Sequence, residues 1–167
     1  MNRIAIRPFE TAEWQRFREF RLAALAAEPG VFASSYSDAE ARPAEDWKRT
    51  IEGSDRRVLG LFDDQRLIGI TAAFTWREDP TGRTAFLAMS FILPEYRGRR
   101  LSRVLYRARL DWIRAQKQFA RVVVSHRASN EASGRAMLHF GFRETHRARK
   151  IWPDSGEEDE VFYELNL

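Results

Sequence analysis

The chain has 167 residues, 44% of them hydrophobic, which suits one folded domain with a proper core. It contains no cysteine, which excludes disulfides, thiolate catalysis and cysteine-bound zinc. Its three histidines (His126, His139 and His146) form no metal-spaced cluster, so we expect no metal. The net charge of +4 suits an anionic ligand.

The N-terminal third of the sequence predicts one strand and two helices. The expected elements are a strand at 4–8, a helix capped by Thr11 and ended by Pro29-Gly30, a turn-rich segment at 31–44 and a helix at 44–52. The first residues lack the apolar core of a signal peptide, and no apolar run is long enough for a membrane span. We therefore expect a cytoplasmic protein with no membrane partner.

From residue 57 onward the pattern is mainly β. The expected elements are strands at 57–63, 66–77 and 85–93, a helix from 101, a strand at 121–126, a helix at 130–140, and a hairpin of 142–152 with 160–165 across the acidic loop 154–159. Gly141 is expected to end its helix in the left-handed conformation. The apolar stripe of the helix from 101 places Arg103, Arg107, Arg109 and Arg114 outward. This order predicts one α/β domain with a mixed sheet.

The segment 92–103, I-L-P-E-Y-R-G-R-R-L-S-R, joins a strand to a helix through a basic turn. Such a junction collects free backbone N–H groups and the positive end of a helix dipole, which together favour a phosphate. Four arginines add full charges: Arg97, Arg99, Arg100 and Arg103. The alternative is an ordinary turn with solvated arginines.

The element order and this motif resemble the GNAT superfamily of N-acetyltransferases, which use acetyl-CoA. The family pattern is Gln or Arg, two variable residues, Gly, one variable residue, and Gly or Ala. It aligns with Arg97 to Ser102, so Arg100 and Ser102 stand where the family has small residues. A second block, from Asn130 to Gly141-Phe142, resembles the family's helix in the same region. The resemblance covers 57–167 as an acetyl-CoA-binding core and 9–56 in outline, as substrate-side helices.

The resemblance implies a mixed sheet of about seven strands, splayed between the fourth and fifth, with about four helices. Acetyl-CoA would lie in the splay, and a backbone N–H near Ile92 would face the thioester oxygen. The cofactor-binding residues that it implies are Phe91, Ile92, Arg97, Gly98, Arg99, Arg100, Leu101, Ser102, Arg103, Asn130, Ser133 and Phe142.

Proton transfer is where the sequence departs from the family. Relatives often carry a Tyr seven residues after the Asn, and some carry a Glu on the fifth strand. The aligned residues here are Met137 and Ser125, which do not titrate. We therefore expect catalysis mainly by proximity and electrostatics. The catalytic candidates are Ser125, Tyr36 and His126, although Tyr36 could simply pack and His126 could point away from the cleft.

Three aromatic residues are candidates for the acceptor site: Phe32, Tyr36 and Trp76. The competing interpretation is that they belong to the core or its rim. The acidic loop 154–159 could attract a cationic amine, or it could be only a solvated hairpin.

The resemblance implies N-acetylation of a small-molecule amine or a protein amino group, with acetyl-CoA and the amine acceptor as partners. The alternative is a GNAT-fold acyl-CoA sensor with little or no catalysis, which the non-titrating Met137 and Ser125 keep open. A homodimer through the last strands is common among such proteins. A nucleic-acid partner is not expected, because the arginines are spread over several elements without interleaved aromatics.

Overall fold

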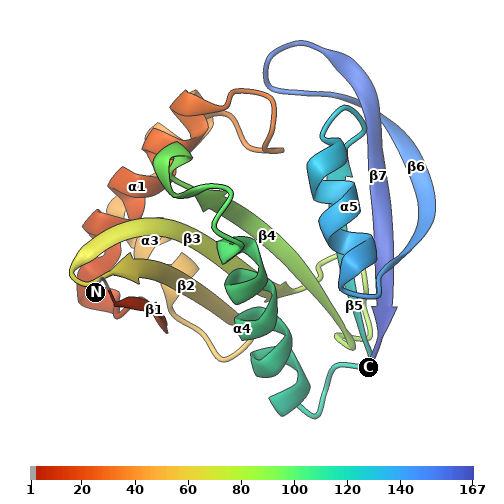
Figure 1. The fold of residues 1–167 in the computed structure, drawn as a ribbon, viewed down its shortest axis with the longest axis horizontal. Helices are drawn as coiled ribbons and strands as arrows, with labels where there is room; N and C mark the ends of the chain where they lie inside the picture. Colours follow the sequence, from red (N-terminus) through yellow and green to blue (C-terminus); the bar gives the residue numbers. More distant parts are fainter. Residues whose placement is uncertain (1–2) are drawn as a thin grey trace.

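A seven-stranded sheet runs through the molecule in the order β1-β2-β3-β4-β5-β7-β6 (Figure 1). The computed structural model describes residues 3–167. The strands are β1 (Ile4–Pro8), β2 (Arg56–Asp63), β3 (Arg66–Thr75), β4 (Thr84–Ile92), β5 (Arg121–Arg127), β6 (Arg143–Ile151) and β7 (Glu157–Asn166). The α-helices are α1 (Trp14–Ala27), α2 (Tyr36–Glu40), α3 (Ala44–Ile51), α4 (Leu101–Ala115) and α5 (Glu131–His139). Short 3-10 turns precede α1 at Thr11–Glu13 and α4 at Pro94–Tyr96.

The sheet is mixed and splayed, as the sequence predicts. Every neighbouring pair of strands is antiparallel except β4 and β5. Those two pair only where Thr84–Phe86 meets Arg121–Val123, whereas β5 pairs with β7 along its whole length to Arg127. The two strands therefore diverge after Phe86 of β4 and Val123 of β5.

A bulge in β4 lies beside this divergence. The register of β4 against β3 shifts between Ile70 and Ala72, and Met89 has a φ of 61°. A positive φ is uncommon outside glycine, and a bulge re-aims the residues that follow it. The hydroxyls of Thr71 and Ser90, 2.8 Å apart, join the two strands at this point.

Two groups of helices bury apolar residues against the sheet. In one core cluster Phe17 of α1 and Trp47 of α3 accompany Ile70 of β3, and the rings of Phe17 and Trp47 meet edge to face. In a second cluster Leu110 of α4 and Met137 of α5 accompany β5. Both groups are needed because a mixed sheet of this kind is hydrophobic on both faces. None of the helices in the described part of the chain combines the length and apolar character needed to cross a bilayer.

Three predicted details of the elements are wrong. The turn-rich segment 31–44 contains the helix α2, whose first turn is capped by the Ser35 hydroxyl accepting from the Asp38 N–H at 3.1 Å. Thr11 lies inside the 3-10 turn and is not the cap. Glu10 is the cap residue, and the Glu13 carboxylate completes a capping box by accepting from the Glu10 N–H at 3.0 Å.

The third wrong detail is the predicted outward orientation of Arg109, which is only 1% exposed. Its position three residues after Tyr106 turns it toward the core. Other differences concern boundaries, since β3 ends at Thr75 and β7 already begins at Glu157 within the predicted acidic loop. Gly141 has a φ of 88°, which confirms the left-handed end of α5.

Candidate functional site

The divergence of β4 from β5 opens a groove of about 790 Å³. This volume lies within the range of ordinary ligand sites. The groove is bounded by the end of β4, the turn into α4, one side of α4, the first turns of α5 and the loop after α1. Its lining residues include Gly30, Ser90, Phe91, Ile92, Arg97, Gly98, Arg100, Leu101, Ser102, Leu105, Tyr106, Arg127, Asn130, Ser133 and Ala136.

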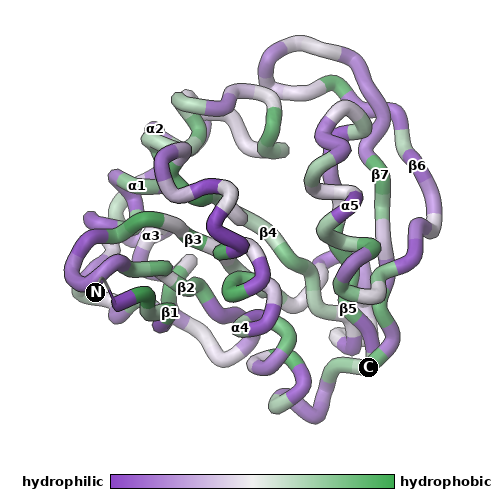
Figure 2. Tube along the Cα trace, in the orientation of Figure 1, coloured by the Kyte–Doolittle hydropathy of each residue, from purple (hydrophilic) through white to green (hydrophobic). Residues whose placement is uncertain are grey.

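One end of the groove is the N-terminus of α4. Gly98 and Arg100 both have left-handed backbones, with φ of 77° and 59°, and Arg100 is the N-cap residue. Backbone turned in this way exposes successive N–H groups on one side, which suits an anion. The helix dipole adds positive potential there. In Figure 2 the segment leading into α4 is hydrophilic, while much of β4 is hydrophobic.

Glycine is needed at position 98 for two reasons. Its φ of 77° strains any L-residue, and the position lines the groove. A Cβ there would meet no atom within 4 Å, so it would project into open space where a ligand could lie. Arg100 has a similar left-handed backbone, and because it carries a Cβ, this conformation costs conformational free energy that glycine would not lose.

The predicted arginines have different surroundings. Arg97 donates from Nε to the Ile92 carbonyl at 2.9 Å and forms an ion pair with Glu28 at 2.6 Å. Arg99 donates to the Glu95 carbonyl at 3.2 Å and does not line the groove. Arg100 lines the groove, and Arg103 lies exposed in the first turn of α4. Arg97 therefore joins the turn before α4 to the loop after α1.

Backbone polar groups of β4 face the open side of the strand. The Leu93 N–H donates to the Ile68 carbonyl at 2.9 Å, toward β3. Alternate residues of a strand turn their N–H and C=O groups to opposite edges. The Ile92 groups therefore face the groove, where its carbonyl already accepts from Arg97. The backbone of Ile92 therefore offers a strand-like partner to an extended ligand, while the Phe91 groups face β3.

The opposite wall is the beginning of α5. The Asn130 side chain accepts from the Ser133 N–H at 3.4 Å and so caps this helix. Ser133 and Ala136 also line the groove, and their small side chains leave room beside the helix. Phe142 lies in the core, 2% exposed, behind this wall and not on it.

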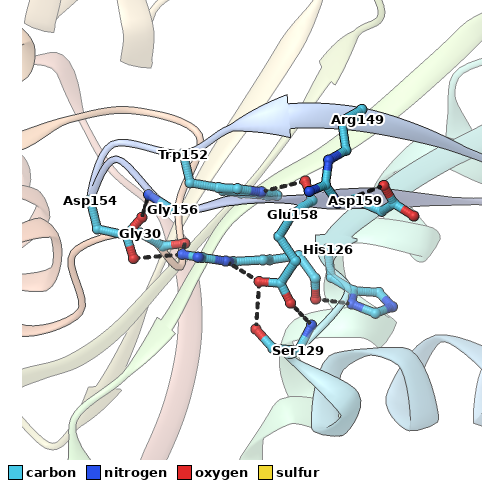
Figure 3. A network of polar contacts seen from close by, with 10 residues as sticks. Gly30, His126, Ser129, Arg149, Trp152, Asp154, Gly156, Glu158 and Asp159 are labelled. Atoms are coloured by element: carbon cyan, nitrogen blue, oxygen red, sulfur yellow. Dashed lines mark hydrogen bonds and ion pairs between the residues drawn. The ribbon is translucent and has the colours of Figure 1, made fainter.

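Arg127 at the end of β5 contacts three segments, and Figure 3 shows its partners Gly30, Asp154 and Glu158 close together. Its guanidinium donates to the Gly30 carbonyl at 3.0 Å and to Asp154 at 2.7 Å, and it also pairs with Glu158. Glu158 accepts from the N–H and hydroxyl of Ser129 at 2.7 and 2.9 Å, just before α5. Hydrogen bonds to Asp154 and then to Glu158 raise the pKa of Arg127 above its usual value, and they outweigh the opposing effect of burial. The loop after α1 is thus fixed to both sides of the groove, by Arg97 and by Arg127.

The sequence model of the acetyltransferase (GNAT) family matches residues 12–142, most of the chain. The chain belongs to this family. No curated protein matches it. The GNAT assignment and the observed seven-stranded mixed sheet confirm the predicted family and fold, and they support acetyl transfer in general.

Solved structures share the GNAT fold at low identity. A GNAT-family acetyltransferase from Streptococcus pneumoniae is 15% identical, with a TM-score of 0.85 over 99% of this chain and 100% of that one. The putative acetyltransferase yncA from Salmonella typhimurium, solved with its cofactor acetyl-CoA, is 18% identical, with a TM-score of 0.81 over 99% and 94%. Arabidopsis thaliana NAA60, solved with a bisubstrate analogue, is 15% identical, with a TM-score of 0.76 over 98% of each chain. At these identities the likeness describes the fold alone.

Ser125 and His126, two of the three catalytic candidates, are neighbours on β5 of this GNAT fold but have different surroundings. Ser125 donates to the Glu160 carboxylate at 2.6 Å, and Glu160 also binds Lys150 at 2.7 Å. His126 is buried, with Nε2 3.2 Å from the Tyr163 hydroxyl and Nδ1 2.6 Å from the Arg127 carbonyl. The structure thus gives Ser125 a carboxylate partner and holds His126 in the interior, and neither is among the residues that line the groove.

The acceptor-site candidates are also separated. Phe32 is buried in the loop after α1, with its ring 6.4 Å from that of Phe91. Tyr36 is 40% exposed and donates to Glu40 at 3.1 Å, which raises the pKa of its phenol. Trp76 follows β3 and stacks on Phe86 at the closed end of the splay. Phe32 alone among the three contacts a residue that lines the groove; Tyr36 and Trp76 do not line it.

Among the residues that line the groove, sequence reasoning missed Glu28, Tyr106 and Arg127, and it also missed Arg109 behind Tyr106. Tyr106 and Arg109 carry a local signal, because they lie one and four residues after Leu105 and so belong to the inward stripe of α4. Glu28 and Arg127 carry none, since their partners are far away in the chain.

Proposed function

We propose that this chain is an acetyl-CoA-dependent N-acetyltransferase in which the acceptor amine attacks the thioester directly. The observation that carries the proposal is one continuous groove. It leads from the exposed N–H groups at the start of α4, along the open edge of β4, to the bulge at Met89–Ser90. We retain the cytoplasmic location and the homodimer as predictions from the sequence.

The residues present fit acetyl-CoA. Backbone N–H groups from Gly98 to Ser102, with the charge of Arg100, suit a pyrophosphate. The open edge of β4 at Ile92 suits the amides of a pantetheine arm, and Asn130 lies on the facing wall. When bound, the thioester supplies the activated acetyl group.

The bulge of β4 supports the placement of the reacting end near Ser90. Backbone N–H groups in that region would stabilise negative charge that develops on the thioester oxygen. Preorganised donors of this kind, together with a correctly held amine, supply much of the rate enhancement of acyl transfer. The chain's contribution is therefore mainly orientation and fixed dipoles.

The amine must lose a proton during acyl transfer. Ser125 and Glu160 form a hydrogen-bonded pair on β5 and β7. We propose that this pair, directly or through water, accepts that proton. Lys150 holds the second Glu160 oxygen and so fixes the carboxylate in place.

The first experiment separates an enzyme from a binding module. Isothermal titration should show that the chain binds CoA and acetyl-CoA. A thiol-release assay over a panel of small primary amines and peptide N-termini should then show acetylation of at least one class. Ser125→Ala and Glu160→Gln should each lower kcat by about 10- to 100-fold, with unchanged acetyl-CoA affinity.

The control is Glu19→Gln, an exposed substitution on α1 outside the groove, which should match the wild type. Tight acetyl-CoA binding without turnover of any amine would instead favour the acyl-CoA sensor, which the non-titrating Met137 keeps open. Absence of CoA binding would refute both functions.

A further inference from the structure

Arg21 is a buried arginine on the side of α1 that faces the sheet. It is 5% exposed, and it lies one turn after Phe17 and one turn before Leu25, both members of the first core cluster. Residues four apart share one face of a helix, so Arg21 points where these apolar residues point. Arginine is almost never buried this fully unless it is paired. Arg21 therefore needs a partner for its charge.

No acidic side chain within residues 3–167 supplies that partner. The Arg21 Nη1 is buried without a hydrogen bond, and no carboxylate pairs with the guanidinium. Burial, and after it the positive charge of Arg42, lowers the pKa of Arg21 to about 10. The donors of Arg42 are themselves engaged, by the Asp46 carbonyl at 2.8 Å and the Thr50 hydroxyl at 2.7 Å. Arg21 is thus an uncompensated cation, which is costly in an interior.

Aromatic rings connect Arg21 to the groove. Its guanidinium carbon lies 4.4 Å from the centre of the Phe32 ring, and the Phe32 ring lies 6.4 Å from that of Phe91. Phe91 lines the groove just after the bulge of β4. A guanidinium that stacks on a ring keeps its in-plane N–H groups available, and these match the geometry of a carboxylate. Arg21 therefore offers free donors one aromatic ring away from the groove.

The bulge of β4 lies between Arg21 and the proposed proton acceptor. Ser125 and Arg127 point to the same side of β5, because alternate residues of a strand share a face. Arg127 binds Gly30, in the loop that also carries Phe32. The proton-accepting pair and the loop after α1 thus lie on one side of the sheet. An amine that reached the bulge from this side would have its base on β5 and the Arg21 guanidinium on α1.

We propose that the acceptor is an aminocarboxylate, a small molecule that carries both an amine and a carboxylate, and that Arg21 binds the carboxylate. This inference rests on the proposed function and names the substrate class of that site. The carboxylate supplies the anion that the buried guanidinium lacks. A neutral alkylamine leaves Arg21 unpaired, and a site with an unpaired buried polar group discriminates strongly against such an analogue.

The first test compares acceptors that differ only in the carboxylate. The panel for the thiol-release assay is glycine, β-alanine, γ-aminobutyrate, leucine and methionine, each beside its carboxamide. The wild-type kcat/KM for the preferred acid should exceed that for its amide by about 100-fold. A carboxamide does not make a nearby amine more basic than a carboxylate does, so easier loss of the amine proton cannot explain this preference. The graded chain lengths reveal the spacing between amine and carboxylate.

Variants of Arg21 assign the preference to this residue. Arg21→Met should lower kcat/KM for the preferred acid by about 100-fold, mainly through KM, and should leave its amide and the Kd for acetyl-CoA unchanged. Arg21→Lys should keep part of the preference, because the charge remains and the planar fork is lost. Arg18→Met is the matched control on the same helix. Arg18 is only half-buried, so this change should keep the wild-type preference.

Thermal unfolding separates a binding role from a structural one. Arg21→Met should raise the Tm of the ligand-free chain by about 2–4 °C, because it replaces an unpaired buried cation by an apolar side chain. The preferred aminocarboxylate, added with CoA, should raise the Tm of the wild type and not that of Arg21→Met. An arginine needed only for the fold would show the reverse: a lower Tm in the variant and an unchanged preference for the acid.

The outcomes distinguish this inference from the proposed function. A wild-type chain that acetylates amides or alkylamines as well as the matching acids would overturn the inference and leave the proposed function standing. An unchanged preference in Arg21→Met would do the same. If Arg21→Met does not fold, the wild-type panel and Arg21→Lys decide. Binding of acetyl-CoA without turnover of any amine would overturn both. A preference for the acid that is lost in Arg21→Met and partly kept in Arg21→Lys would establish the inference.

Discussion

Arg100 stands where the family pattern has glycine. The left-handed backbone at this position suits glycine, and a side chain there costs about 1–2 kcal/mol. Its location at the groove and at the start of α4 gives a reason to keep a positive charge despite that cost. The departure therefore exchanges some stability for charge beside an anion site.

Replacing Arg100 by glycine should relieve this strain. Arg100→Gly is expected to raise the free energy of unfolding by about 1 kcal/mol and Tm by about 2–4 °C, measured by urea and thermal unfolding. Arg99→Gly is the matched control, because Arg99 is not among the residues with a positive φ. It should bring no gain. Equal effects of the two changes would contradict the strain argument.

The loop between α1 and α2 lines one side of the groove with its first residues. Glu28 binds Arg97, and the Gly30 carbonyl binds Arg127, so opposite walls of the groove hold the first residues of the loop. Glu28 also places a negative charge beside a groove that is otherwise suited to an anion. The loop therefore both positions Arg97 and weakens the field near it.

Removing the charge of Glu28 should strengthen acetyl-CoA binding. Glu28→Gln is expected to lower the Kd about threefold at low salt, because Arg97 is freed from a competing carboxylate. The gain should shrink as salt rises to 0.5 M, measured by isothermal titration. Glu19→Gln, on the exposed side of α1, serves as the control. Weaker binding by Glu28→Gln would instead show that fixing the loop matters more than charge.

At the scale of the whole molecule, the stability of the fold should depend on acid pH through the N-terminal segment. The Arg7 guanidinium lowers the pKa of Glu13 from 4.5 to about 2, and Glu13 also holds the Glu10 N–H at the start of α1. A carboxyl whose folded pKa is lowered stabilises the fold above its unfolded pKa. That contribution is lost as pH falls through the window from 4.5 to 2.

Glu13→Gln should remove this dependence. At pH 7 the variant should be less stable by about 1 kcal/mol, after allowance for solvent screening of a surface pair. The difference should disappear near pH 2, as followed by urea unfolding at several pH values. Arg7→Met should abolish the same part of the pH dependence. A constant difference at all pH values would show that Glu13 acts through packing alone.

The sequence by itself determined the family and the mixed sheet, and the resemblance to that family implied the location of the splay. These features rest on local patterns: the glycine and arginines before α4, the Asn130–Gly141 block, and the order of the strands. Each of these patterns involves residues that are close together in the chain. The same holds for the left-handed Gly141, whose place after an apolar helix is a local signal.

Only the tertiary structure decided which charges meet. Arg127 donates a hydrogen bond to Gly30, 97 residues away in the chain, and Ser125 donates one to Glu160, 35 residues away. No local pattern encodes such pairs, because they depend on how strands and loops lie in space. Arg109 is a different case: its spacing from Leu105 is a local signal for the inward face of α4, but the polarity of arginine predicts exposure, and the structure buries it beside Tyr106.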